Sequence, residues 1–231
     1  MIYYTGDTHC DLERIAVFCS ERNLNKDDVM IILGDVGLNY YTDLRAYYAK
    51  YTYSKRITCT LFCIHGNHEQ NPEYMDGMLT KTWNGGTVFY EEDFPDILYA
   101  KDGEIFDLGG KKTVVLGGAY SIDKGYRIMN GLNWFADEQM SPEVRKRCEN
   151  NLEKAGWKVD VVLSHTVPLS AEPVEFFIKG IDQSKVDKTT ECWLEKIKER
   201  LTYQKWLAGH YHCEIEKSDN IEILYYSIKE F

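Results

Sequence analysis

Residues 29–35 read VMIILGD, an uninterrupted apolar run that ends in Gly34 and Asp35. An apolar run without polar alternation is typical of a strand that is buried on both faces, as in parallel sheets. In open α/β sheets, the carboxyl ends of the strands line the crevice where ligands bind. The stretch therefore predicts an α/β fold with a functional carboxylate at Asp35.

Similar strand-like runs lie on either side of this stretch. We expect strands at residues 2–5 and 59–64, and helices at residues 12–22 and 43–55. The first of these helices is indicated by apolar residues that recur at helical spacing. A strand–helix–strand–helix–strand order predicts parallel strands that are joined by right-handed crossovers.

The rest of the chain is less regular. Residues 71–112 hold several glycines and short apolar pieces, which favour loops and antiparallel strands, and residues 119–140 look like a long functional loop. The remaining expected elements are strands at 113–116, 159–163 and 205–208, helices at 142–155 and 190–201, and a β-hairpin of 214–217 with 221–228. Without a repeat or a linker, residues 1–231 are expected to form a single domain.

Charge and composition narrow the classes of function. The net charge of -10 disfavours non-specific binding to nucleic acid or to an anionic membrane. No apolar run approaches the length of a membrane-spanning helix, and the first residues lack the pattern of a secretory signal, so a cytoplasmic protein is expected. The seven cysteines, an odd number, are expected to be reduced and mostly buried.

Metal-capable side chains follow five of the expected strands. Each motif alone is a weak signal, because a lone Asp or His after a strand is usually a turn or surface residue. All six histidines of the chain nevertheless lie at these strand ends, whereas a random placement would put some on helices and loops. The candidate metal ligands are Asp7, His9, Asp35, Asn67, His165, His210 and His212.

This ligand chemistry suits a dinuclear centre. A mixture of imidazole, carboxylate and amide oxygen favours first-row divalent ions such as Mn, Fe or Zn. One aspartate has two oxygens and can bridge two ions. Two ions about 3.5–4 Å apart can clamp a phosphate and activate a water molecule. We therefore expect two divalent metal ions as cofactors.

The motifs as a set resemble the calcineurin-like metallophosphoesterase superfamily, in the form of its small bacterial and phage-type members. They occur in the order of that family and span residues 7–212. The resemblance implies two mixed β-sheets packed as a sandwich and flanked by helices, an α/β/β/α arrangement. It also implies one ion held by Asp7, His9, Asp35 and His212, and a second held by Asp35, Asn67, His165 and His210, with Asp35 bridging.

The function that follows is hydrolysis of a phosphate mono- or diester by in-line attack of a metal-bridging hydroxide. His68 would act in catalysis at the leaving oxygen or on the transition state. A phosphorylated small molecule is the expected substrate. A nuclease of the same superfamily and a catalytically silent metal-binding scaffold are the alternatives. A serine hydrolase is rejected, because no Gly-x-Ser-x-Gly elbow surrounds Ser164.

Two departures from the family pattern matter. Many members carry a second Asp three residues after the bridging Asp, which orients the catalytic histidine in protein phosphatases, but Leu38 stands there in this sequence. The Arg that precedes Gly-Asn-His in protein phosphatases is replaced by His65. Both differences argue against a eukaryote-type protein phosphatase, and they leave open what orients His68.

A basic stretch in the loop of residues 119–140 is a candidate substrate-binding segment. Lys124 and Arg127 are cations in an acidic protein, and Arg127 suits two-pronged binding of phosphate oxygens. Trp134 is expected to pack, with stacking on a planar substrate group as the alternative. Glu69 is expected to orient metal ligands, and Tyr211 to face away from the metals.

Overall fold

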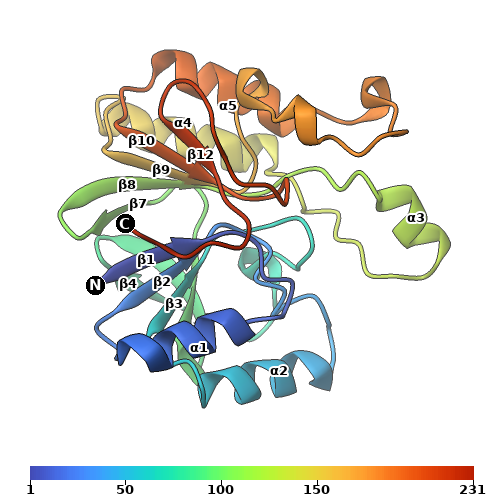
Figure 1. Ribbon diagram of the computed structural model, residues 1–231. Helices are drawn as coiled ribbons and strands as arrows, with labels where there is room; N and C mark the ends of the chain where they lie inside the picture. Colours follow the sequence, from blue (N-terminus) through green and yellow to red (C-terminus); the bar gives the residue numbers. More distant parts are fainter.

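Two β-sheets lie face to face, and helices cover the outer face of each (Figure 1). A computed structural model describes all residues from Met1 to Phe231. The first sheet contains β1 (Ile2–Thr5), β2 (Val29–Ile32), β3 (Thr60–Cys63), β4 (Leu79–Trp83), β5 (Gly86–Glu91), β6 (Phe94–Ala100) and β13 (Lys229–Glu230). The second contains β7 (Ile105–Leu108), β8 (Lys111–Leu116), β9 (Val161–Ser164), β10 (Lys205–Ala208), β11 (Ile215–Glu216) and β12 (Ile221–Ile223).

The helices are α1 (Glu13–Arg22), α2 (Leu44–Ser54), α3 (Lys124–Met129), α4 (Pro142–Lys154) and α5 (Thr189–Arg200). Four single 3₁₀ turns complete the secondary structure: Pro72–Tyr74, Leu169–Ala171, Val174–Phe176 and Gln183–Lys185. Figure 1 shows α1 and α2 below the first sheet and α4 and α5 above the second. None of these helices combines the length and apolarity that crossing a membrane requires.

Both sheets mix parallel and antiparallel strands. The order in the first sheet is β13-β1-β2-β3-β6-β5-β4, with β1, β2, β3 and β6 parallel to one another. The order in the second is β11-β12-β10-β9-β8-β7, with β8, β9, β10 and β12 parallel. The parallel opening and the sandwich of two mixed sheets flanked by helices, both expected from the sequence, are confirmed.

Three apolar layers hold the sandwich together. Helix α1 buries Ile15 and Cys19 against the outer face of the first sheet. Phe62 and Leu163 belong to the layer between the sheets, and Leu194 of α5 belongs to the layer on the outer face of the second sheet. Burial on both faces is why β2, β3 and β9 read as continuous apolar runs rather than as alternating ones.

The C-terminal segment differs from the hairpin that the sequence predicted. The paired part is short, with β11 antiparallel to β12, and β13 crosses to the other sheet to pair with β1. Arg14 holds the crossing in place, because its Nη2 donates hydrogen bonds to the carbonyl oxygens of Tyr225 at 2.9 Å and Asp7 at 2.8 Å. Residues 224–228 therefore serve as a strap between the sheets rather than as an extension of β12.

Residues 119–140 also contain more structure than the predicted loop. Helix α3 forms within them and projects away from both sheets (Figure 1). None of its residues is buried, so the helix has no apolar stripe. Such a stripe is the pattern by which a helix is predicted from a sequence. An ion pair between Asp123 and Arg127, four residues apart, supports it instead.

Candidate active site

The carboxyl ends of β1, β2 and β3 from the first sheet meet those of β9 and β10 from the second at one edge of the sandwich. The structure brings all seven sequence-predicted metal ligands together there. They are Asp7, His9, Asp35, Asn67, His165, His210 and His212. Each of the seven is separated by more than 20 residues from at least one partner that it approaches, so only the fold assembles the group.

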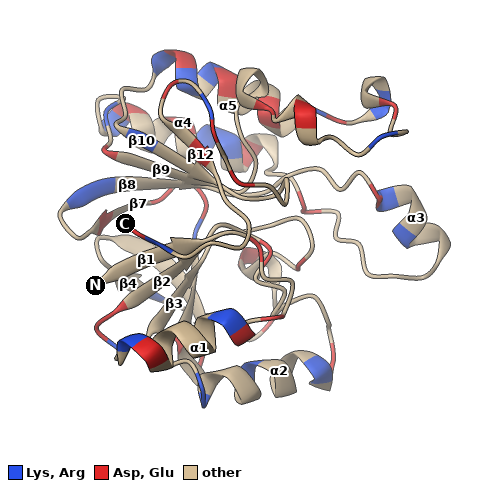
Figure 2. Cartoon of the chain, viewed as in Figure 1, with Lys and Arg blue, Asp and Glu red and all other residues tan.

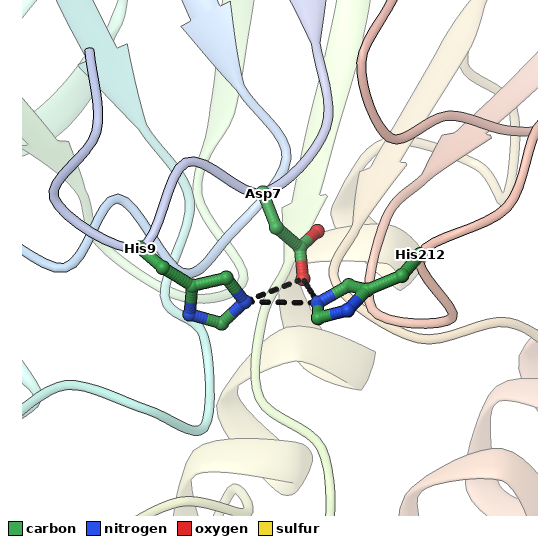
Figure 3. A group of neighbouring side chains, drawn as sticks. All are labelled: Asp7, His9 and His212. Atoms are coloured by element: carbon green, nitrogen blue, oxygen red, sulfur yellow. Dashed lines mark hydrogen bonds and ion pairs between the residues drawn. The ribbon is translucent and has the colours of Figure 1, made fainter. Parts of the chain in front are cut away.

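The first part of this group is formed by Asp7, His9 and His212 (Figure 3). The Nε2 atoms of His9 and His212 are 2.8 Å apart, and Oδ2 of Asp7 lies 3.2 Å from Nε2 of His212 and 3.8 Å from Nε2 of His9. Oδ1 of Asp7 accepts a hydrogen bond from the backbone N–H of His210 at 2.8 Å. One oxygen is thus fixed by the backbone while the other faces the two imidazoles.

The second part is formed by Asn67, His165 and His210. Oδ1 of Asn67 lies 2.8 Å from Nε2 of His165 and 3.1 Å from Nδ1 of His210. The amide is oriented by Ser121, because Nδ2 of Asn67 donates to its hydroxyl oxygen at 2.8 Å. Nδ1 of His165 is 2.8 Å from the carbonyl oxygen of Leu33 and donates to it, so Nε2 is the nitrogen that faces Asn67 and Asp35.

Asp35 lies between the two parts. Its Oδ1 accepts a hydrogen bond from the backbone N–H of His68 at 2.8 Å. Its Oδ2 lies 3.6 Å from Nε2 of His165 and 3.9 Å from Nδ1 of His9. Asp35 therefore approaches one histidine from each part, which is the position that a bridging ligand requires.

Burial and mutual charge set the ionisation of these groups. Burial opposes ionisation of Asp7 and Asp35, but nearby histidines, His165 first, keep the pKa of both carboxyls below the ordinary value. Burial also opposes protonation of His165, but Asp35 and Asp7 raise its pKa to about 9. Burial and the charge of His165 lower the pKa of His210 to about 3. The site thus holds ionised carboxylates, and the hydrogen bond to Asp7 also raises the pKa of His212, whereas burial lowers the pKa of His9.

The carboxylate and imidazole atoms that have no hydrogen-bond partner in the site are suited to bind divalent cations. Oδ2 of Asp7 is buried and accepts no hydrogen bond. A buried carboxylate oxygen without a donor is costly unless a cation satisfies it. Three carboxylate–imidazole groups have ligand atoms within 4.8 Å of one another: Asp7–His9–His212, His9–Asp35–His68 and Asp7–Asp35–His165. Imidazole and carboxylate together are the donor set that Mn, Fe and Zn accept.

Close packing and strained backbone hold the ligands in place. A Cβ on Gly34 would lie 2.0 Å from Nδ1 of His165, so only glycine leaves room for that ring. His9, Asp35, His210 and His212 all have positive φ, between 46° and 69°. Such backbone is costly for residues with a side chain and persists where the surrounding structure enforces it, often at functional sites.

His68 lies beside this group and contacts two residues of the α3 segment. Nη2 of Arg127 is 2.9 Å from Nδ1 of His68, and Oδ1 of Asp123 is 3.6 Å from Nε2. Nε of Arg127 donates to Oδ2 of Asp123 at 2.8 Å. Leu38, at the place of the family's orienting Asp, is fully buried in the apolar layer under α1.

The contact of Asp123 with His68 was not predicted from the sequence, although the spacing of four residues between Asp123 and Arg127 indicated an ion pair.

The other sequence-predicted residues take varied positions. Nζ of Lys124 lies 4.0 Å above the Trp134 ring, whose Nε1 donates to Glu138, so Trp134 packs as expected. Both oxygens of Glu69 accept backbone N–H bonds from the loop that follows β2. Glu69 thus braces the loop that carries Asp35. Tyr211 directs its hydroxyl to Thr166, which is not a candidate ligand.

His65 takes no part in the ligand group. It is buried, and its Nδ1 lies 3.1 Å from Oδ2 of Asp102. Oδ1 of Asp102 accepts the backbone N–H of Gly117, at the start of the loop that leads to α3. His65 therefore ties the end of β3 to the end of β8 instead of presenting a cation to the site.

Comparison with known proteins places the chain in a family. No curated protein matches it. The family model for calcineurin-like phosphoesterases matches residues 1–214, a span that includes every strand end of the candidate site. The ligand groups at those strand ends agree with a metal-dependent phosphoesterase. The chain belongs to the calcineurin-like phosphoesterase family.

Proposed function

We propose that this protein hydrolyses a phosphate mono- or diester of a small molecule and uses two divalent ions, of Mn, Fe or Zn. The observation that carries the proposal is the position of Asp35. Its Oδ2 lies within 4 Å of histidines from both parts of the ligand group. A carboxylate in this place can join two ions, which is the arrangement of dinuclear phosphoesterases.

The seven candidate ligands would be shared between two ions, with the Asp35 carboxylate common to both. One ion would be held by Asp7, His9, Asp35 and His212, and the other by Asp35, Asn67, His165 and His210. When bound, the two ions supply a nucleophilic hydroxide near neutral pH and neutralise the phosphate oxygens. Because the backbone N–H groups of His210 and His68 fix one oxygen of each aspartate, the other oxygens are oriented in advance.

The chain itself supplies the groups that act on the substrate. Arg127 is half-buried beside the ligand group and offers N–H donors to phosphate oxygens. His68 is held between Asp35 and Asp123, so one ring nitrogen faces the ligand group and the other faces a carboxylate. We propose that Nδ1 assists the leaving oxygen once the phosphate takes over the Arg127 N–H that points at this nitrogen, while Asp123 keeps the ring in that orientation.

The charge distribution supports a small substrate rather than a nucleic acid polymer. The protein carries a net charge of -10. In the cartoon of Figure 2, Lys and Arg are scattered along the chain among Asp and Glu. Polymer binding depends on several phosphate contacts by Lys or Arg. This argues against the nuclease alternative.

Hydrolysis assays test the proposal. Metal-stripped protein resupplied with Mn is given bis-p-nitrophenyl phosphate or p-nitrophenyl phosphate, and the wild type is compared with His68→Ala. Activity that requires the metal and falls about 10²- to 10⁴-fold in the variant is expected. The preferred ester identifies the reaction subclass. Absence of hydrolysis with metal verified in the site would refute the proposed chemistry for these esters and favour the scaffold alternative.

A further inference from the structure

A cavity of about 530 Å³ opens directly beside the ligand group. At one end it is lined by Asp35, Asn67 and His68, where the phosphate would lie. Its far wall comes from the segment between β9 and α5, including Phe177 and Val186. The volume falls within the range of about 300–1,000 Å³ that small-molecule sites occupy. There is room for a leaving group as well as for the phosphate.

The far wall is apolar and partly aromatic. Phe176 and Ile178 line the cavity and are 51% and 63% exposed. Phe177 lies nearly parallel to Tyr211, with ring centroids 6.1 Å apart and an angle of 14°. The segment that carries these side chains, orange in Figure 1, projects beyond the sheet on the same side as α3. Large apolar side chains gathered at the mouth of a cavity are typical of a binding surface.

One polar group on the cavity wall lacks a partner. Glu191, in the first turn of α5, is 3% exposed, and its Oε1 accepts a hydrogen bond from Thr166 at 2.9 Å. Its Oε2 is buried and has no hydrogen-bond partner. Burial raises the pKa of this carboxyl to about 7. When the carboxyl is ionised, a buried acceptor of this kind is costly unless a ligand donates to it.

The charges around the cavity disfavour a second phosphate on the leaving group. Lys188 is the cation on the far wall, and its Nζ is 2.5 Å from Oε1 of Glu172. The same Nζ lies 4.9 Å above the Phe177 ring. Because Lys188 is already neutralised and Glu191 is an acceptor, the wall favours an uncharged group that donates a hydrogen bond.

We propose that this cavity binds the leaving group of the substrate, and that this group is flat, aromatic, uncharged and equipped with an N–H donor for Oε2 of Glu191. The apolar wall contacts the flat face of the group, and Glu191 selects for the donor. A nucleobase has this chemistry, and the cavity holds one such group rather than a polymer. This inference rests on the proposed function, because that function places the phosphate at the ligand group.

Matched substrates test the proposal on the wild-type protein. The Mn-loaded enzyme is given adenosine 5′-monophosphate, purine riboside 5′-monophosphate, which lacks the amino group, and ribose 5-phosphate, which lacks the base. All three release the same kind of alkoxide. We expect kcat/KM to fall by about tenfold or more on loss of the amino group, and further on loss of the base. Equal values for all three esters would overturn the proposal.

Two variants test whether the cavity wall causes the preference for substrates with the amino group. Glu191→Met keeps the side-chain length but removes the acceptor, so it should abolish the preference for the amino group. Glu199→Met, at an exposed position of the same helix, is the control and should retain the preference. A Glu191→Met enzyme that still discriminates as the wild type does would overturn the assignment.

Binding of nucleosides separates this proposal from the proposed function. Adenosine and purine riboside carry no phosphate, and their dissociation constants for the Mn-loaded protein are measured by calorimetry. If adenosine binds about tenfold more tightly than purine riboside, the cavity proposal is supported. If no ester is hydrolysed in that case, only the proposed function fails. Hydrolysis of p-nitrophenyl phosphate together with equal or absent binding of both nucleosides would overturn the cavity proposal alone.

Discussion

Oδ1 of Asp123 lies 3.6 Å from Nε2 of His68 and has no hydrogen-bond partner of its own. The other oxygen of Asp123 accepts a hydrogen bond from Arg127, which fixes the carboxylate. Leu38 occupies the place of the orienting Asp found in many family members and is packed in the core. We therefore assign to Asp123, which comes from a different loop, the positioning of His68.

Replacing Asp123 by Asn should lower kcat about 10- to 100-fold with little change in KM, because His68 loses its orienting carboxylate. The loss should be larger for esters with poor leaving groups, since these depend most on His68. Steady-state kinetics with a series of aryl phosphates checks the expectation.

A double variant decides whether Asp123 acts through His68. In the His68→Ala background, Asp123→Asn should cause little further loss, because residues that act as a unit are not additive. Asp43→Asn is the control, since Asp43 also pairs with an Arg but lies at the exposed start of α2. Fully additive losses would assign Asp123 a separate role.

Ser121→Ala should weaken the binding of one metal ion about 10- to 100-fold, because Asn67 loses the hydroxyl that orients its amide. Titration of the metal-stripped protein with Mn should show one weakened step and one unchanged step. Ser54→Ala, which removes an exposed hydroxyl bonded to a backbone carbonyl, serves as the control. Two unchanged steps would show that Asn67 needs no support from Ser121.

Gly34→Ala should destabilise the protein more than backbone strain alone explains. A Cβ there would lie 2.0 Å from the ring of His165. Gly180 has the same φ of +93° but open space around it, so Gly180→Ala measures the strain alone, about 1–2 kcal/mol. Urea unfolding of the metal-stripped variants should show an additional loss for Gly34→Ala, and its affinity for Mn should fall. Equal losses would contradict the role of Gly34 as the space for His165.

Glu191 should make the metal-stripped protein less stable as the pH rises. Burial raises its pKa from 4.5 to about 7 in the folded state, so the folded state binds more protons between these values than the unfolded state does. The stability contribution of Glu191 is complete below pH 4.5 and is lost as the pH rises through 7. Relative to the wild type, Glu191→Gln should gain up to about 3 kcal/mol at pH 8–9. Denaturant unfolding of both proteins across pH 4–9 checks this, and a difference that is independent of pH would contradict it.

The sequence predicts the part of the site that is encoded by strand ends. Asp7, Asp35 and His165 each follow a buried apolar strand, and buried strands are the clearest signal in a sequence. Their convergence follows from parallel strands having their carboxyl ends at one edge. The family resemblance also predicts which ligands share each ion around Asp35. This division of the ligands stays a prediction.

The parts that sequence reasoning missed depend on contacts without a local pattern. Helix α3 has no apolar stripe, and the spacing of Asp123 and Arg127 indicates only an ion pair between them, so the approach of Asp123 to His68 is not visible in the sequence. The last strand, β13, pairs with β1 at the opposite end of the chain, and two residues are too short for a periodic signal. Glu191 reads as an ordinary acidic residue in the first turn of a helix, and only burial reveals its unpaired oxygen.

The most direct test of the central claim is to measure bound Mn per chain together with the hydrolysis of p-nitrophenyl and bis-p-nitrophenyl phosphate as Mn is added to metal-stripped protein. If Asp35 joins two ions, activity should appear only as the second ion binds, and Asp35→Asn should lose both the second ion and the activity. Full activity with one ion per chain, or two tightly bound ions in Asp35→Asn, would contradict a dinuclear centre bridged by Asp35.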